Sequence, residues 1–216
     1  MSIAENVARI KAELPPGVLL CAAAKQNGAQ AVREAIRAGV DCIGENRVQE
    51  LLNKESQGAY EGAPLHFIGH LQRNKARFIV GRCELIHSVD SHALMSVIDK
   101  IASSKSIVQD VLIEVNIGRE ETKSGVLPEE LDEFLEGCFA FSSVRVVGLM
   151  AIPPAQGDPR RYFSAMHKLY VDMNAKKYDN KMKFLSMGMS GDYLAAAAEG
   201  ANIVRVGTAI FGARIY

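Results

Sequence analysis

One lysine ends the first strongly apolar segment of the chain, and its position suggests covalent chemistry. Lys25 directly follows residues 19–24, a run of leucine, cysteine and alanine. A lysine amine that loses its water is held in the neutral form, which is the nucleophile that forms a Schiff base with an aldehyde. The alternative is a lysine that only extends from a strand end to solvent. Both interpretations stay open on this pattern alone.

Two glycine-containing segments near the C-terminus could bind an anion. The segment 187–192 follows one apolar run and precedes a helical pattern, and the segment 204–212 lies in the next apolar run. Glycine lets main-chain N–H groups approach an anion, and the start of a helix adds a partial positive charge. Ser190 could cap the helix or bond a phosphate oxygen, and Gly207 and Thr208 fall in the second segment. Each segment alone is compatible with a tight turn, but the pair on neighbouring strands favours an anion site.

A lysine amine together with a phosphate site suggests pyridoxal 5′-phosphate as the ligand. Its aldehyde would form an aldimine with Lys25, while its phosphate would lie over the last two strands. Arg205 then falls where it could face the pyridine nitrogen. A permanent cation there opposes protonation of that nitrogen, so the ring would be a weaker electron sink than one that faces a carboxylate. The alternative for Arg205 is an ion pair at the rim of the fold.

Eight short apolar segments alternate with amphipathic ones, and they predict the scaffold that holds these residues. Most lack strict alternation, which is typical of parallel strands that are buried on both faces. The predicted strands are 18–24, 42–44, 65–69, 85–89, 111–117, 144–152, 184–189 and 203–211. The alternation predicts an α/β protein, a single (β/α)8 TIM barrel domain over residues 1–216, with an extra N-terminal helix at Ile3–Glu13. A doubly wound open sheet is the alternative.

Composition and charge exclude several classes of protein. The 25 Lys and Arg residues balance 25 Asp and Glu residues, so nothing predicts binding to nucleic acid or to an anionic membrane. The apolar run 18–24 is too short to span a bilayer, and no basic and apolar leader opens the chain, so we expect a cytoplasmic protein. The four cysteines form no CxxC pair, and we expect no metal site. The GxGxxG motif of dinucleotide-binding enzymes and the GxSxG motif of serine hydrolases are also absent.

Seven segments in the same order resemble the pyridoxal phosphate homeostasis protein family, and the similarity runs over nearly the whole chain. The segments are 24–25, 43–50, 66–75, 123–125, 148–152, 185–190 and 204–212. Any one of them is modest evidence, but their common order is specific. The resemblance implies a single-domain barrel similar to the N-terminal domain of bacterial alanine racemase.

The resemblance also implies the residues around the cofactor. It places an aldimine at Lys25 and puts Asn46 near the cofactor, with Arg205 facing the ring nitrogen. The full set of expected contacts is Lys25, Asn46, Met150, Met189, Ser190, Arg205, Gly207 and Thr208, of which Ser190, Gly207 and Thr208 hold the phosphate. Ala24 stands where many members of the family carry Ser or Thr, which removes a hydroxyl contact and leaves the aldimine unaffected.

Two functions are compatible with this site. The family takes part in cellular homeostasis of vitamin B6 without an established reaction, so the resemblance implies a protein that holds or delivers the cofactor, with apo-enzymes as partners and no catalytic residue. The alternative is an amino-acid racemase or related enzyme with weak activity. Related racemases take a second acid/base, a tyrosine, from an added β-domain, but only five residues follow Phe211 here. Tyr193 is the one nearby candidate, and packing is the preferred interpretation for it.

Smaller expectations concern assembly and two other lysines. The racemase dimer depends on the added domain, so we expect a monomer. Lys123 lies just after the fifth predicted strand, where it could form a secondary aldimine or attract the anionic cofactor. Lys75 falls in one of the segments that resemble the family. For both residues, an exposed loop lysine without a role is the alternative.

Overall fold

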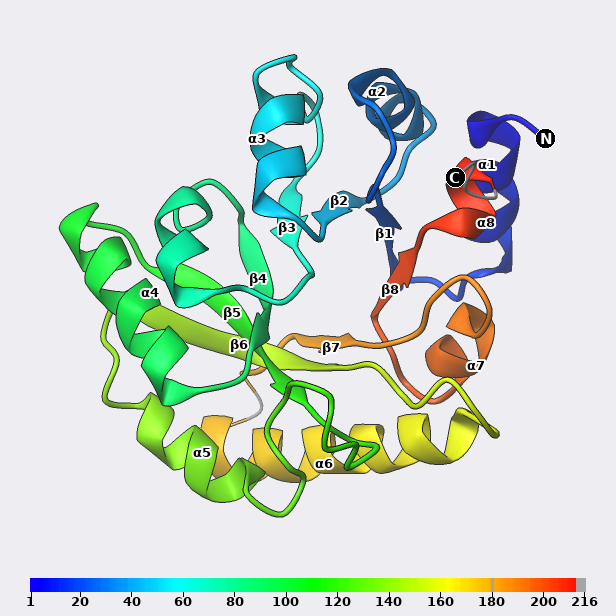
Figure 1. Ribbon diagram of the computed structural model, residues 1–216. Helices are drawn as coiled ribbons and strands as arrows, with labels where there is room; N and C mark the ends of the chain where they lie inside the picture. The colour runs from blue at the N-terminus through cyan, green and yellow to red at the C-terminus, as the bar shows by residue number, and fades with distance from the viewer. Residues whose placement is uncertain (180, 213–216) are drawn as a thin grey trace.

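The computed structural model describes residues 1–179 and 181–212, and eight parallel strands form a closed barrel within them (Figure 1). The strands are β1 (Leu19–Ala23), β2 (Cys42–Glu45), β3 (Leu65–Phe67), β4 (Leu85–Val89), β5 (Gln109–Val115), β6 (Val144–Ala151), β7 (Phe184–Ser186) and β8 (Ile203–Val206). Consecutive strands pair in order, and β8 pairs with β1, where Leu19 lies opposite Ile203. This closure confirms the predicted TIM barrel and excludes the open sheet.

Helices follow the strands and cover the outside of the barrel (Figure 1). They are α1 (Ile3–Glu13), α2 (Ala29–Arg37), α3 (Val48–Glu55), the 3-10 helix η1 (Arg73–Phe78), α4 (His92–Ser104), α5 (Leu131–Cys138), α6 (Arg160–Tyr178), α7 (Tyr193–Ala198) and α8 (Thr208–Phe211). The bounds of α1 are those predicted. A capping box fixes its start, because Ser2 Oγ accepts the Glu5 N–H while the Glu5 carboxylate accepts the Ser2 N–H. None of the helices in the described ranges is long and apolar enough to cross a bilayer.

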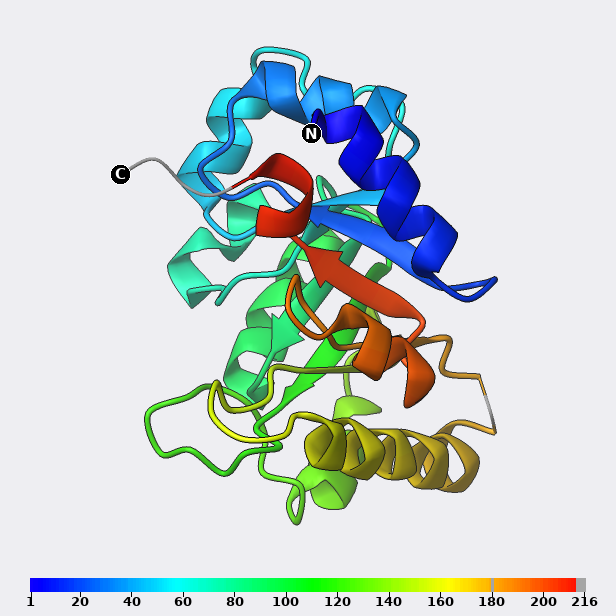
Figure 2. The ribbon, with the colours of Figure 1, turned by 90° about the vertical axis from the view of Figure 1, so that its right-hand side faces the viewer.

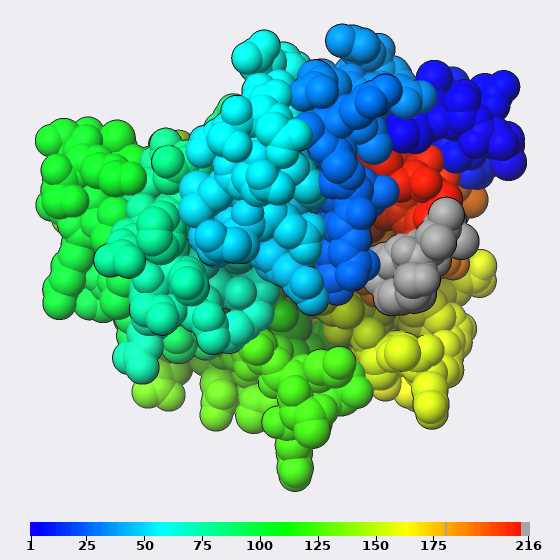
Figure 3. Space-filling model, turned by 45° about the horizontal axis from the view of Figure 1, so that its top comes forward, coloured from blue at the N-terminus to red at the C-terminus, as the bar shows by residue number. Residues whose placement is uncertain are grey.

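The first and last described helices lie side by side. Figure 2 shows α8 next to α1, and Asn6 Nδ2 donates to Ile210 O at 2.9 Å. In the space-filling view, the red C-terminal segment lies directly against the blue N-terminal one (Figure 3). The extra N-terminal helix therefore holds α8, and with it the loop that carries Gly207, against the closing strands of the barrel.

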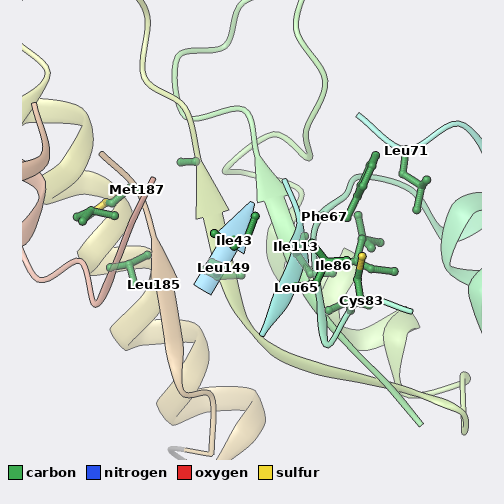
Figure 4. Close-up of a cluster of buried hydrophobic side chains, with 14 of the residues drawn as sticks. Ile43, Leu65, Phe67, Leu71, Cys83, Ile86, Ile113, Leu149, Leu185 and Met187 are labelled. Carbon is green, nitrogen blue, oxygen red and sulfur yellow. The ribbon is translucent and has the colours of Figure 1, made fainter. Parts of the chain in front are cut away.

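Two clusters of buried hydrophobic side chains follow from the alternation of side chains along each strand. One cluster packs between the strands and the helices, and Figure 4 shows part of it, including Ile43, Phe67 and Ile86. The alternate positions fill the barrel interior with Cys21, Cys42, Ile68, Leu85, Leu112, Val147, Met150 and Ile203. Because both faces of most strands are buried, the sequence shows apolar runs in place of an apolar and polar alternation.

The last strand is shorter than predicted. The sequence predicts a strand over 203–211, whereas β8 ends at Val206 and α8 begins at Thr208. Gly207 between them has φ −113° and ψ −80°, which is outside strand geometry. The apolar run 209–211 fits a buried strand and a buried helix equally well, so periodicity alone could not separate them. β3 and β7 also end earlier than predicted, at Phe67 and Ser186.

Candidate functional site

A pocket of about 320 Å³ lies at the carboxyl ends of the strands, where TIM barrels place their functional residues. Its lining consists of Ala23, Lys25, Asn46, Ile68, Ile152, Met189, Ser190, Gly191, Arg205, Gly207 and Thr208. Every residue that the sequence predicts around the cofactor therefore lines this pocket, except Met150. Pockets that bind small ligands have volumes of roughly 300–1,000 Å³, so the volume suits a small ligand.

Lys25 lines this pocket from a tight turn that follows β1. Asn27 N–H closes the turn by donating to Ala24 O at 3.0 Å. Lys25 is half-buried, and its amine forms no hydrogen bond or ion pair with any other residue in the described ranges. The amine is therefore available to a ligand in the pocket.

The two glycine-containing loops meet at Ser190. Its Oγ accepts the N–H of Gly207 at 3.1 Å and the N–H of Ala209 at 3.2 Å, so one hydroxyl links the loops after β7 and β8. The N–H groups of Ser190, Gly191 and Thr208 donate to no other group in the part of the chain that the structure describes. Several free main-chain donors at the edge of one pocket are what an anionic group needs.

Glycine is required at position 188 for a structural reason that is independent of any ligand. Its φ is +91°, and a Cβ there would lie 2.5 Å from the Cβ of Ala196 in α7. Only glycine adopts this conformation without strain and leaves room for the helix. For this glycine the tight-turn interpretation is therefore sufficient, while Ser190 and Gly191 remain the residues of that loop that line the pocket.

Arg205 stands at the end of a buried chain of hydrogen bonds. Its Nη1 donates to Ser186 Oγ at 2.6 Å, and its Nη2 donates to Ala151 O at 3.0 Å. Ser186 Oγ lies 3.1 Å from His87 Nδ1, and His87 Nε2 lies 3.1 Å from His66 Nδ1. No carboxylate in the described ranges forms an ion pair with Arg205, so the structure does not support the ion-pair alternative. These hydrogen bonds instead fix the Arg205 guanidinium at the wall of the pocket, where the residue is 4% exposed.

Burial keeps the two imidazoles of this chain neutral. Burial lowers the pKa of His66 to about 4. Burial also lowers the pKa of His87, and the neighbouring His66 and Arg205 act in the same direction. Neutral imidazoles add no second positive charge beside Arg205, so they position the guanidinium without repelling it.

We expect His66 to make the fold less stable in mild acid. The pKa of His66 is about 4 in the folded protein and 6.5 for an ordinary histidine, so between these pH values the unfolded chain binds a proton that the folded protein does not. The contribution of His66 to the free energy of unfolding is therefore complete above pH 6.5 and is lost as the pH decreases toward 4. This group alone should remove about 3 kcal/mol of unfolding free energy between pH 7 and pH 4. Urea unfolding at both pH values measures the loss.

The matched comparison for this prediction uses two histidine variants. His66→Asn should lose less stability on acidification than the wild type. His167→Asn, which removes an exposed histidine on α6, is the matched control variant. An unchanged dependence in His66→Asn would contradict the assignment.

Met150 does not line this pocket. It is 1% exposed and packs in the barrel interior with Leu112 and Ile203. Ile152, two residues further along and so on the same face of the segment, lines the pocket. The contact of Met150 with the cofactor stays a prediction.

The other two predicted lysines line neighbouring hollows. Lys123 is exposed and lines a hollow of about 410 Å³ that shares Asn46 and Met189 with the pocket. Lys75 is half-buried and lines a hollow of about 270 Å³ that also includes Asn46. Neither lysine lines the pocket of Lys25 itself.

Sequence reasoning missed Glu114, which lines the same hollow as Lys123. Burial raises the pKa of this carboxyl to about 7, and the charge of Asp90 acts in the same direction. A single glutamate inside the apolar segment 111–115 was the available signal. Its inward direction could not be seen, because a run of apolar residues does not show which face of a strand points into the barrel.

Tyr193 is engaged away from the pocket. Its side chain is buried, its hydroxyl donates to the Glu13 carboxylate, and Arg9 Nη1 lies 3.5 Å from the same hydroxyl. Tyr193 does not line the pocket. These contacts tie α7 to α1 and agree with the packing interpretation.

Comparison with known proteins identifies the family. The sequence model described as alanine racemase, N-terminal domain, matches residues 1–215. A pyridoxal phosphate homeostasis protein of Aquifex aeolicus is 44% identical over 200 residues, which are 91% of this chain and 87% of the relative. Another, of Pseudomonas aeruginosa, is 37% identical over 228 residues, which cover all of this chain and 97% of the relative.

Comparison with solved structures identifies the same family. PipY of Synechococcus elongatus, solved without PLP, matches with a TM-score of 0.92 and 36% identity, over 98% of this chain and all of PipY. The same protein with PLP bound matches with a TM-score of 0.90. Alanine racemase of Clostridium difficile matches with a TM-score of 0.78 but 17% identity over 57% of its own length, which shows a shared fold only. The chain therefore belongs to the alanine racemase N-terminal domain family and, within it, to the pyridoxal phosphate homeostasis proteins.

Proposed function

We propose that this protein binds pyridoxal 5′-phosphate through a Schiff base to Lys25 and takes part in the homeostasis or delivery of the cofactor. The observation that carries the proposal is the Lys25 amine, which has no partner in the described ranges and lines a pocket that also holds free main-chain donors and a buried cation. The amine attacks the aldehyde carbon, the new bond is a C=N bond, and the aldehyde oxygen leaves as water. The bound aldehyde supplies an electrophilic carbon and a conjugated ring.

The other residues of the pocket contact different parts of the ligand in this proposal. In this proposal the N–H groups of Ser190, Gly191 and Thr208 hold the phosphate, and the Ser190 hydroxyl keeps the two loops together. Arg205 would face the ring nitrogen, where its fixed charge would oppose protonation. Asn46 and Met189 also line the pocket, together with the apolar side chains of Ala23, Ile68 and Ile152.

Two observations support a carrier over a racemase. Relatives that match almost the whole chain are named homeostasis proteins. None of the tyrosines that the structure describes lines the pocket, and the hydroxyl of Tyr193 is engaged with Glu13. We propose a monomeric, cytoplasmic protein with one domain over residues 1–216, whose partners are apo-enzymes that require the cofactor.

Two measurements test this function. Titration of the purified protein with pyridoxal 5′-phosphate should produce a visible absorption band that saturates at one ligand per chain. Assays over a panel of amino acids should show no racemisation above that of the free cofactor. A protein that shows no visible band after it is separated from excess cofactor would contradict binding, and turnover that disappears in Lys25→Ala would favour the racemase.

A further inference from the structure

The turn that presents Lys25 contains a strained residue. Lys25 and Gln26 are its two central residues, and Gln26 has φ +65°. This is the left-handed region, which favours glycine at the third position of such a turn and costs other residues about 1 kcal/mol or more. Such a conformation persists only where the surroundings hold it.

Helix α3 supplies groups that hold both sides of this turn. Lys54 Nζ donates to Ala24 O at 2.7 Å, on the main chain just before Lys25. Glu50 Oε2 accepts the Gln26 N–H at 2.7 Å, on the main chain just after it. Glu50 and Lys54 are one helical turn apart on α3, and their charged atoms are 3.9 Å apart. The peptide groups on both sides of Lys25 are therefore held by one helix.

The charge of Lys54 is buried at a cost that the fold alone does not explain. The Lys54 side chain is 6% exposed, and Nζ forms an ion pair with Glu45 Oε1 at 2.6 Å. Glu45 is fully buried, and its Oε2 has no partner in the described ranges. Buried ion pairs are often no more stabilising than well-packed apolar side chains. The contact of Lys54 that apolar packing could not replace is the one with Ala24 O.

We propose that Lys54 and Glu50 are positioning residues that fix the turn 24–27 so that the Lys25 amine is presented to the pocket, with Glu45 holding Lys54. This inference rests on the proposed bond between Lys25 and the aldehyde. The clamp acts on Lys25 alone and leaves the loops after β7 and β8 untouched. Its loss should therefore weaken the covalent step and spare the binding of the phosphate.

Paired ligands separate these two effects. Pyridoxine 5′-phosphate carries the same ring and phosphate but has an alcohol in place of the aldehyde, so it cannot react with Lys25. In Lys54→Met and Glu50→Ala, affinity for pyridoxal 5′-phosphate should fall at least tenfold, while affinity for pyridoxine 5′-phosphate should change less than twofold. Lys100→Met, an exposed lysine on α4, is the matched control and should change neither affinity.

Rescue variants make the test independent of general damage to the fold. Glu50→Gln keeps an oxygen acceptor for the Gln26 N–H and should retain most of the affinity for the aldehyde. Adding Gln26→Gly to Glu50→Ala should recover at least threefold, because glycine adopts positive φ without the clamp. Equal losses for both ligands, or no loss for either, would overturn the clamp. A wild-type protein that forms no bond at Lys25 would instead overturn the proposed function.

Discussion

Replacing Lys25 by alanine should abolish the visible band of the protein in pyridoxal 5′-phosphate. The amine of Lys25 is the one at the pocket wall, since the nearby Lys54 is engaged with Glu45 and Ala24 O. Without it no Schiff base can form, although the phosphate contacts remain. We expect affinity to fall by about two orders of magnitude, which corresponds to about 3 kcal/mol of binding free energy. Spectroscopic titration and equilibrium dialysis measure the band and the affinity separately.

Matched lysine variants control this prediction. Lys75→Ala and Lys123→Ala remove amines that line neighbouring hollows, and both proteins should keep the visible band. Lys100→Ala controls for the loss of a surface charge. A band that survives in Lys25→Ala and disappears in Lys123→Ala would place the bond at Lys123 and contradict our account.

Replacing Ser190 by alanine should weaken binding through the phosphate. The variant frees the N–H groups of Gly207 and Ala209 and removes the link between the two loops. In our account the Ser190 hydroxyl holds in place the two loops whose N–H groups bind the phosphate. Displacing one such hydrogen bond to a charged group costs about 1.5–3 kcal/mol, so affinity for pyridoxal 5′-phosphate should fall roughly 10- to 100-fold. Affinity for pyridoxal, which lacks the phosphate, should stay within about twofold of the wild type.

The comparison of the two ligands makes this second prediction specific. A general loosening of the site would lower the affinity for both ligands together. Ser56→Ala, at the exposed end of α3, removes a hydroxyl far from the two loops and should affect neither. If Ser190→Ala loses affinity for pyridoxal as strongly as for its phosphate, Ser190 does not act on the phosphate.

The sequence predicted the elements that depend on local signals. The start of α1 follows from the capping box of Ser2 and Glu5, and β4 fills the segment between the charged residues Glu84 and Asp90. The end of β8 was wrong because the run 209–211 suits a strand or a helix, and its choice depends on packing against α1. Local pattern therefore gave the barrel and its order, and tertiary contacts decided the strand ends.

Some residues of the site could likewise be predicted from the sequence, and others could not. Lys25, Ser190 and Arg205 could be found because each lies near or beyond the carboxyl end of a strand, and barrel geometry brings these ends to one face. That Ile152 and not Met150 lines the pocket could not be seen, because the two share one face and the sequence does not show how deep each lies in the barrel. The series of side-chain hydrogen bonds from Arg205 to His66 could not be predicted, because its residues come from separate strands with no fixed spacing in the sequence.

Borohydride reduction of the wild-type protein with pyridoxal 5′-phosphate, followed by peptide mass mapping, tests the central claim most directly. Reduction converts a Schiff base into a stable amine bond and leaves the cofactor attached to the lysine that held it. Our account predicts one label per chain, on the peptide that contains Lys25. A label on Lys75 or Lys123 with Lys25 unmodified, or a protein that carries no label, would contradict it.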